Sequence, residues 1–123
     1  MTAVVCIDRN RLALEDIVAI ARGTARPVLS PDPAFRAFIQ RGADFLDRLL
    51  LEDGAIYGVT TGYGDSCTVP VPLVLVTELP HPLYTFPGCG LGSFLSPAGT
   101  RAVMAARLAS LAKGFSGVSI DLL

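Results

Sequence analysis

A twenty-residue segment rich in glycine and proline, residues 53–72, most constrains how this chain can fold. Its four glycines and two prolines interrupt any helix or strand pattern, so we expect a long loop here. Loops longer than about 12–15 residues are usually functional or disordered. This loop also contains apolar and aromatic side chains, among them Ile56, Tyr57 and Tyr63, which disordered linkers lack. The segment is therefore a candidate functional loop.

Helical patterns lie on both sides of this loop. Apolar residues at helical spacing predict a short helix over 14–22, a longer one over 33–52 and a last one over 97–113. Asp32 and Ser96 each precede a proline, the arrangement of an N-cap followed by the first helical residue. Because the last helix is rich in alanine, we expect it in a crowded interior.

Two short stretches, residues 3–7 and 26–29, are predicted to be extended. Residues 73–86 fit either a helix broken by prolines or a strand. The predicted fold class is therefore mainly α, with one or two short N-terminal strands and a long Gly-rich loop.

The composition excludes several classes of protein. The chain is 51% apolar and only 17% charged, against about 25% charged in a typical soluble domain, and this excludes disorder. Its net charge of −1 does not favour nucleic acid, and no run reaches the roughly 18–20 apolar residues of a membrane helix. We also find no signal-peptide pattern. We expect one 123-residue domain that is part of something larger.

The three cysteines form no close pair, which favours reduced thiols in the cytoplasm over a disulfide framework or a zinc site. Cys67 and Cys89 are expected to be small buried residues. Residues 79–120 contain three cations, Arg101, Arg107 and Lys113, and no acid. We expect one or both of Arg107 and Lys113 to be buried and paired with a carboxylate from elsewhere.

Three sequence blocks resemble a known family. Residues 56–64 read IYGVTTGYG and resemble the Y-G-[VIL]-[NT]-T-G-[FY]-G signature of the histidine, phenylalanine and tyrosine ammonia-lyases. Residues 107–117 read RLASLAKGFSG and resemble that family's R-x-x-S-L-A-K-G-x-S-G block. Between these blocks, Leu79, Leu83, Gly90 and Gly92 resemble the paired leucines and the G-x-G of a third segment of that family. The order and spacing of the blocks identify residues 1–123 as the N-terminal part of such a lyase.

The resemblance implies elimination of ammonia from an α-amino acid to give an α,β-unsaturated acid. It implies an electrophile, 4-methylidene-imidazol-5-one (MIO), formed from an internal Ala-Ser-Gly tripeptide. Tyr57 matches the tyrosine that removes the β-proton, and Gly64 lies in the same substrate-binding loop. A phenol titrates near pH 10, so such a base needs neighbours that favour the phenolate. The glycines would let the loop close over substrate.

Phe86 and Pro87 align with the family's substrate-selectivity pair. Phe86 suits an aromatic ring, although core packing is an equal alternative. Pro87 departs from the family's usual residues, so the choice among phenylalanine, tyrosine and histidine stays open, as does that between lyase and aminomutase.

No Ala-Ser-Gly tripeptide occurs in the sequence; the nearest strings are residues 108–111 and 115–117. We therefore expect the chain alone to be inactive, as a truncated reading frame or one half of a split enzyme. The resemblance implies homotetramers with shared active sites, so the expected partners are the rest of the enzyme, sister subunits and the amino acid substrate. The alternatives are a non-catalytic interaction module and a small protein that binds an aromatic ligand at Phe86.

Overall fold

The computed structural model describes residues 2–52, 55–78, 81 and 90–123. It consists of two compact units, and the boundary between them falls inside one helix, after Leu46. The first unit comprises residues 1–46 and 94–123, and the second comprises residues 47–93. Each unit is described separately below.

The first unit begins with a β-α-β arrangement. Strands β1 (Ala3–Ile7) and β2 (Ala25–Leu29) are parallel and hydrogen-bonded, with Ala3 opposite Ala25. Parallel strands need a crossover connection, and helix α1 (Leu14–Arg22) provides it. Gly23 ends α1 with a φ of +74°, a left-handed conformation that glycine adopts at little cost. Both predicted extended stretches and the predicted short helix are confirmed.

Two longer helices follow, and both begin as the cap residues predict. In α2 (Pro33–Leu51), the amide of Ala34 donates to Asp32 Oδ1 at 2.9 Å. In α4 (Pro97–Leu111), the amide of Gly99 donates to Ser96 Oγ at 3.1 Å. The predicted mainly helical fold class is confirmed.

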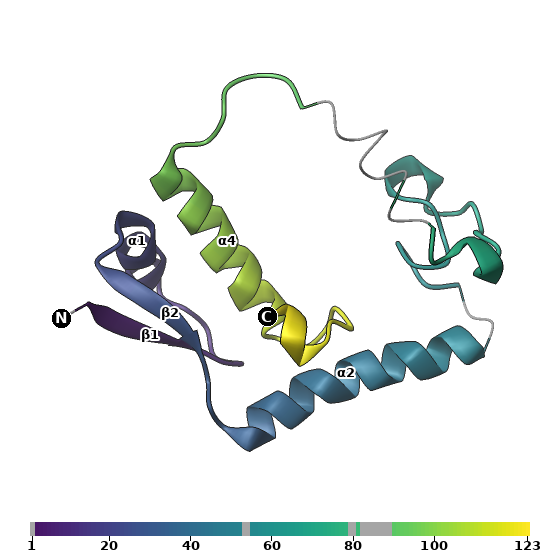
Figure 1. Ribbon diagram of the computed structural model, residues 1–123, viewed down its shortest axis with the longest axis horizontal. Coiled ribbons are helices and arrows are strands. Elements are labelled where there is room, and N and C mark those ends of the chain that lie inside the picture. The colour runs from purple at the N-terminus through teal and green to yellow at the C-terminus, as the bar shows by residue number, and fades with distance from the viewer. Residues whose placement is uncertain (1, 53–54, 79–80, 82–89) are drawn as a thin grey trace. The chain divides into compact units, whose positions relative to one another are not determined.

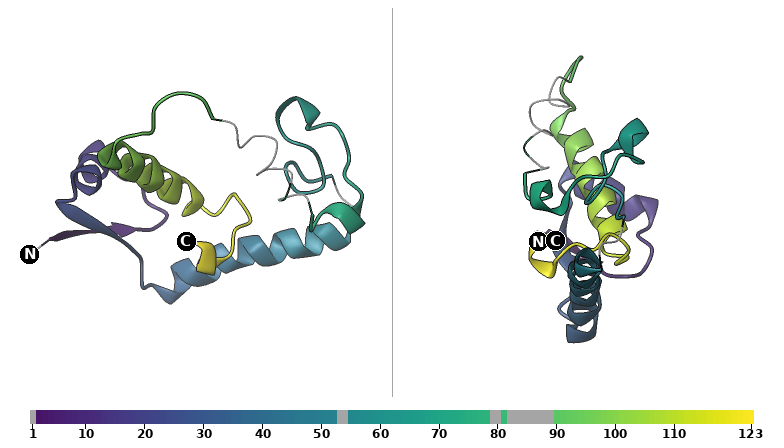
Figure 2. Two further views of the ribbon diagram at one scale, coloured as in Figure 1. Left: turned by 45° about the horizontal axis from the view of Figure 1, so that its top comes forward. Right: turned by 90° about the vertical axis from the view of Figure 1, so that its right-hand side faces the viewer.

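Helix α4 lies alongside α1, and two apolar clusters hold the first unit together (Figures 1 and 2). One contains Ile7 of β1, Phe35 and Ile39 of α2, and Ala112, which follows α4. The other contains Ile20, Ala25 and Ala105. Burial of a side chain the size of isoleucine contributes roughly 1.5–3 kcal/mol, so these few residues contribute much of the unit's stability.

The residues after α4 fold back onto α2 between Phe38 and Leu46 (Figure 2). Gly114 has a φ of +78°, and a Cβ at this position would overlap the ring of Phe38. A Cβ on Gly117 would lie 3.1 Å from Leu46 Cδ2, and one on Gly42 would lie 3.3 Å from the Gly114 oxygen. The two glycines of the second sequence block are therefore needed for close packing against α2.

The second unit contains the whole of the Gly-rich loop, residues 53–72. Its described residues include two short 3₁₀ helices, η1 (Gly64–Ser66) and η2 (Leu73–Leu75), and an isolated antiparallel bridge between Thr61 and Pro70. The ambiguous segment thus begins with a 3₁₀ turn, and its residues 79–80 and 82–86 lie outside the described residues.

Several residues that the sequence predicts to be buried are exposed in this chain. Within α4 only Ala105 is buried, whereas Val103 and Met104 are 58% and 65% exposed. Arg107 of α4 and Lys113, which follows it, are both exposed, and their pairing with a carboxylate from elsewhere stays a prediction. Cys67 is also exposed, because it follows η1 on the surface of the loop. Cys89 lies outside the described residues.

Among the described residues, no helix has both the length and the hydropathy that a membrane span requires.

Replacing Gly114 by alanine should destabilise the first unit much more than replacing Gly23. Both residues have left-handed backbones, which cost an alanine about 1–2 kcal/mol, but only Gly114 faces an aromatic ring. The overlap with Phe38 should add about 1–3 kcal/mol. Urea unfolding followed by circular dichroism measures both variants, and equal losses would contradict the packing role of Gly114.

Candidate functional site

Tyr57 lies on a tight turn at the start of the described loop. The amides of Val59 and Thr60 both donate to the carbonyl oxygen of Ile56, at 3.0 and 2.9 Å. The Tyr57 side chain is 67% exposed, so the loop's own residues leave it accessible. The turn therefore holds the backbone compactly and directs the phenol away from the packed part of the loop.

Two threonine hydroxyls hold the backbone on either side of Tyr57. The amide of Ile56 donates to Thr60 Oγ1 at 2.7 Å, and the amide of Gly58 donates to Thr61 Oγ1 at 3.1 Å. The Thr61 hydroxyl in turn donates to the carbonyl oxygen of Gly62 at 3.0 Å, and this residue is only 6% exposed. Buried polar groups with satisfied hydrogen bonds rigidify a structure, so these two residues fix the turn.

Three glycines of the loop have structural reasons to be glycine. Gly58 has a φ of +70°, and a Cβ there would lie 3.4 Å from Tyr63 Cε1. A Cβ on Gly62 would lie only 2.7 Å from the Ser66 oxygen. Gly64 has a φ of +57°, with open space beside it, where η1 begins. The loop thus uses glycine for its shape.

A short antiparallel pairing closes the base of the loop. The amide of Gly62 donates to the Val69 oxygen at 3.0 Å, and the amide of Val71 donates to the Thr60 oxygen at 2.8 Å. The intervening residues form η1 and a following turn. The long loop expected from the sequence is therefore an ordered unit with its own hydrogen bonds.

The structure brings only some of the predicted site residues together. Tyr57 and Gly64 belong to the same hydrogen-bonded loop, whereas Phe86 and Pro87 lie outside the described residues. Sequence reasoning missed Thr60 and Thr61, although adjacent threonines in a turn are a known signal, because their hydroxyls can bond to nearby backbone.

The residues present do not fit an MIO group. Ser110 lies inside helix α4 between Ala109 and Leu111, where its backbone carries helical hydrogen bonds. Ser116 precedes a glycine but follows Phe115, and that glycine, Gly117, packs against Leu46. Among the described residues, no group of three histidine, cysteine or acidic side chains could hold a metal ion.

A family model for aromatic amino acid lyases matches residues 12–123, and the chain belongs to that family. The match is consistent with the N-terminal portion that the sequence blocks predict.

Histidine ammonia-lyases are among its curated relatives. The enzyme from Bos taurus is 33% identical over 119 residues, which cover 97% of this chain and 18% of the relative. The enzyme from Streptococcus pyogenes serotype M5 is 35% identical over 122 residues, covering 98% of this chain and 23% of the relative. The chain thus spans about a fifth of the length of these relatives.

Solved structures agree with the fold. Tyrosine aminomutase from Streptomyces globisporus is 30% identical with a TM-score of 0.86, covering 98% of this chain and 23% of that one. Ergothionase from Treponema denticola is 19% identical with a TM-score of 0.84, and the match covers 97% of this chain and 24% of that one. The two proteins therefore share the fold over this region.

Replacing Thr61 by valine should loosen the turn that carries Tyr57. The variant keeps the shape of the side chain but leaves the Gly58 amide and the Gly62 oxygen without their partner, at a cost of about 1–3 kcal/mol. Amide exchange measured by NMR should show faster exchange at Gly58. The matched control is Thr68→Val at an exposed position. An equal effect of both variants on exchange at Gly58 would show that the Thr61 hydroxyl does not fix the turn.

Proposed function

We propose that this chain supplies the tyrosine-bearing part of an aromatic amino acid or histidine ammonia-lyase. The observation that carries the proposal is Tyr57, an exposed phenol on a turn fixed on both sides by the Thr60 and Thr61 hydroxyls. A catalytic base must be held within hydrogen-bond reach of the proton that it removes. Because the turn fixes the backbone of Tyr57, its phenol can be held in one position relative to a bound substrate.

The proposed step at Tyr57 is removal of a proton from the β-carbon of the substrate. The electron pair of the broken C–H bond forms the double bond, the C–N bond breaks, and ammonia leaves with its bonding pair. The product is an α,β-unsaturated acid. This chemistry needs Tyr57 as the phenolate and a site closed to water, so further polypeptide must cover the exposed ring.

Gly64 is proposed to lie on the substrate side of the loop, because the space beside its backbone is open. Phe86 and Pro87 are proposed as the selectivity pair, with Phe86 against an aromatic or heteroaromatic ring. Their placement rests on their alignment with the family alone.

The electrophile of the family is proposed to come from residues outside this chain, because the tripeptide that would form it is absent. The chain would then be inactive by itself and would act only with the remainder of the enzyme, in a homotetramer like those of the family. The same absence supports a second candidate, a non-catalytic interaction module derived from a lyase. A third candidate is part of an aminomutase of the same family, which the similarity to a tyrosine aminomutase supports.

The chain alone should give no product with phenylalanine, tyrosine or histidine, because it lacks the electrophile. Mixing it with a Streptococcus pyogenes histidine ammonia-lyase polypeptide that lacks the matching segment should restore turnover. Absorbance at about 280–310 nm, where conjugated aryl acids absorb, measures the product. Turnover by the chain alone would contradict the proposal.

In the restored mixture, Tyr57→Phe should lower kcat by about 100-fold or more, the range expected for loss of a general base. The control is Tyr63→Phe, which removes a phenol from the same loop but keeps the ring beside Gly58. Restored turnover that is insensitive to Tyr57→Phe would exclude Tyr57 as the base. If co-assembly occurs with no turnover at all, the interaction module replaces the enzyme proposal.

A further inference from the structure

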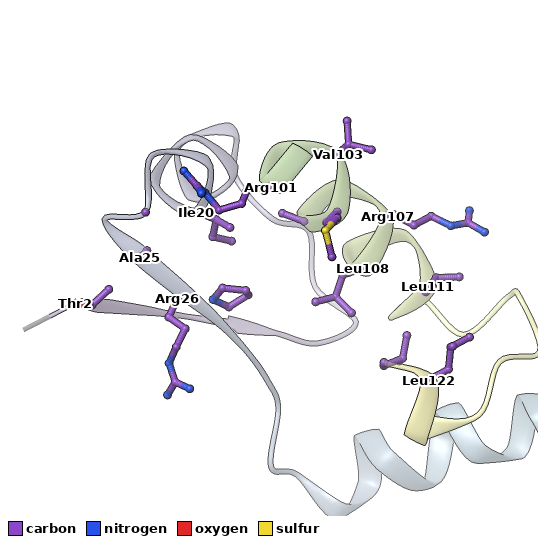
Figure 3. Close-up of a pocket in the computed structure, with 15 residues that line it drawn as sticks. Thr2, Ile20, Ala25, Arg26, Arg101, Val103, Arg107, Leu108, Leu111 and Leu122 are labelled. Atoms are coloured by element: carbon purple, nitrogen blue, oxygen red, sulfur yellow. The ribbon is translucent and has the colours of Figure 1, made fainter. Parts of the chain in front are cut away.

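An open apolar groove of about 670 Å³ lies on the first unit, between β2, α4 and the C-terminal residues (Figure 3). Its lining includes Ile20 and Ala25 on one side and Met104, Leu108 and Leu111 of α4 on the other. Met104 is largely exposed, although it is an apolar side chain in the middle of a helix. Exposed apolar surface of this extent usually marks a site that another molecule covers.

The charged side chains that line this groove are all basic. They are Arg26 of β2 and Arg101 and Arg107 of α4, and no lining side chain is acidic. Leu123 also lines the groove, so in the 123-residue chain its terminal carboxylate adds one negative charge against three positive ones. The Arg101 Nε donates to the carbonyl oxygen of Ala21 at 2.9 Å, so this side chain is held by α1. Arg26 and Arg107 are exposed and extend from different elements, one below β2 and one from α4 (Figure 3). The apolar surface is thus flanked by two accessible guanidinium groups.

We propose that this groove binds an amphipathic helix with acidic residues beside its apolar face, supplied by the polypeptide that completes the lyase. Carboxylates on the flanks of such a helix would meet Arg26 and Arg107, while its apolar face would cover Met104. The α4 side of the groove extends from Arg101 to Leu111, which is about 15 Å at 1.5 Å per residue. That length suits about three turns of a second helix and exceeds a single amino acid.

The charges and shape argue against two other occupants. A second copy of this chain docked through the same groove would bring the arginines of both copies into one interface, and an excess of like charge across an interface is unfavourable. A lipid surface is bound by a protruding amphipathic face, whereas this surface is hollowed (Figure 3). The proposal rests on the proposed function in one respect, that a further polypeptide completes the lyase, and does not depend on any activity of Tyr57.

Binding of a designed peptide to the whole 123-residue chain tests this inference. The probe is a fluorescent helical peptide of about 18 residues with leucines on one face and glutamates on both flanks. A matched peptide carries lysines in place of the glutamates. Fluorescence anisotropy should show saturable binding of the acidic peptide, weakened by added salt, and binding of the lysine peptide at least about tenfold weaker.

Arg107→Glu should weaken binding of the acidic peptide by about tenfold, and Met104→Asp should weaken it as well. Lys113→Glu is the matched control, because Lys113 is an exposed cation of the same segment that does not line the groove. Circular dichroism confirms that the exposed substitutions leave the fold intact.

Three results would overturn the proposal. In the first, the chain binds the acidic and the lysine peptide equally well, or binds neither. In the second, Arg107→Glu and Lys113→Glu weaken binding equally. In the third, the chain binds phosphatidylglycerol vesicles more tightly than the acidic peptide. A dimer in light scattering that Met104→Asp dissociates would instead assign the groove to a second copy. None of these measurements involves ammonia release, so failure here is distinct from failure of the proposed enzyme function.

Discussion

The first unit depends on the close approach of Gly114 to the ring of Phe38. Because Gly114 has no side chain and can adopt a positive φ, the chain can turn directly after α4 and return along α2. Just before this turn, Ala112 lies in the cluster with Ile7 and Ile39, so the residue that follows α4 contributes to the core. A larger side chain at position 114 would overlap the ring of Phe38 and displace either the ring or the turn.

The loop that carries Tyr57 is built on a different principle. It has little apolar burial of its own, and its order comes from backbone hydrogen bonds together with those of the Thr60 and Thr61 hydroxyls. Such bonds fix a backbone locally without requiring a core. The loop can therefore present an exposed phenol in a defined position while the surface needed to close the site comes from elsewhere.

The low charge of the sequence is explained by the surface that the first unit leaves open. Met104 and its neighbours on α4 are apolar where a complete small domain would be polar. The sequence predicts that Arg107 or Lys113 is buried with a carboxylate, and in the isolated chain both are exposed. The docking proposal gives Arg107 that carboxylate on another segment, whereas Lys113 stays outside the groove.

The sequence by itself determined the helices, the two strands, the caps at Asp32 and Ser96, and the family. These features depend on local patterns: periodicity, an N-cap next to proline, and short motifs. Only the tertiary structure decided why Gly114 must be glycine, where Arg107 lies, and that an apolar groove forms between β2 and α4. Those facts depend on contacts between residues far apart in the chain, which no local pattern encodes.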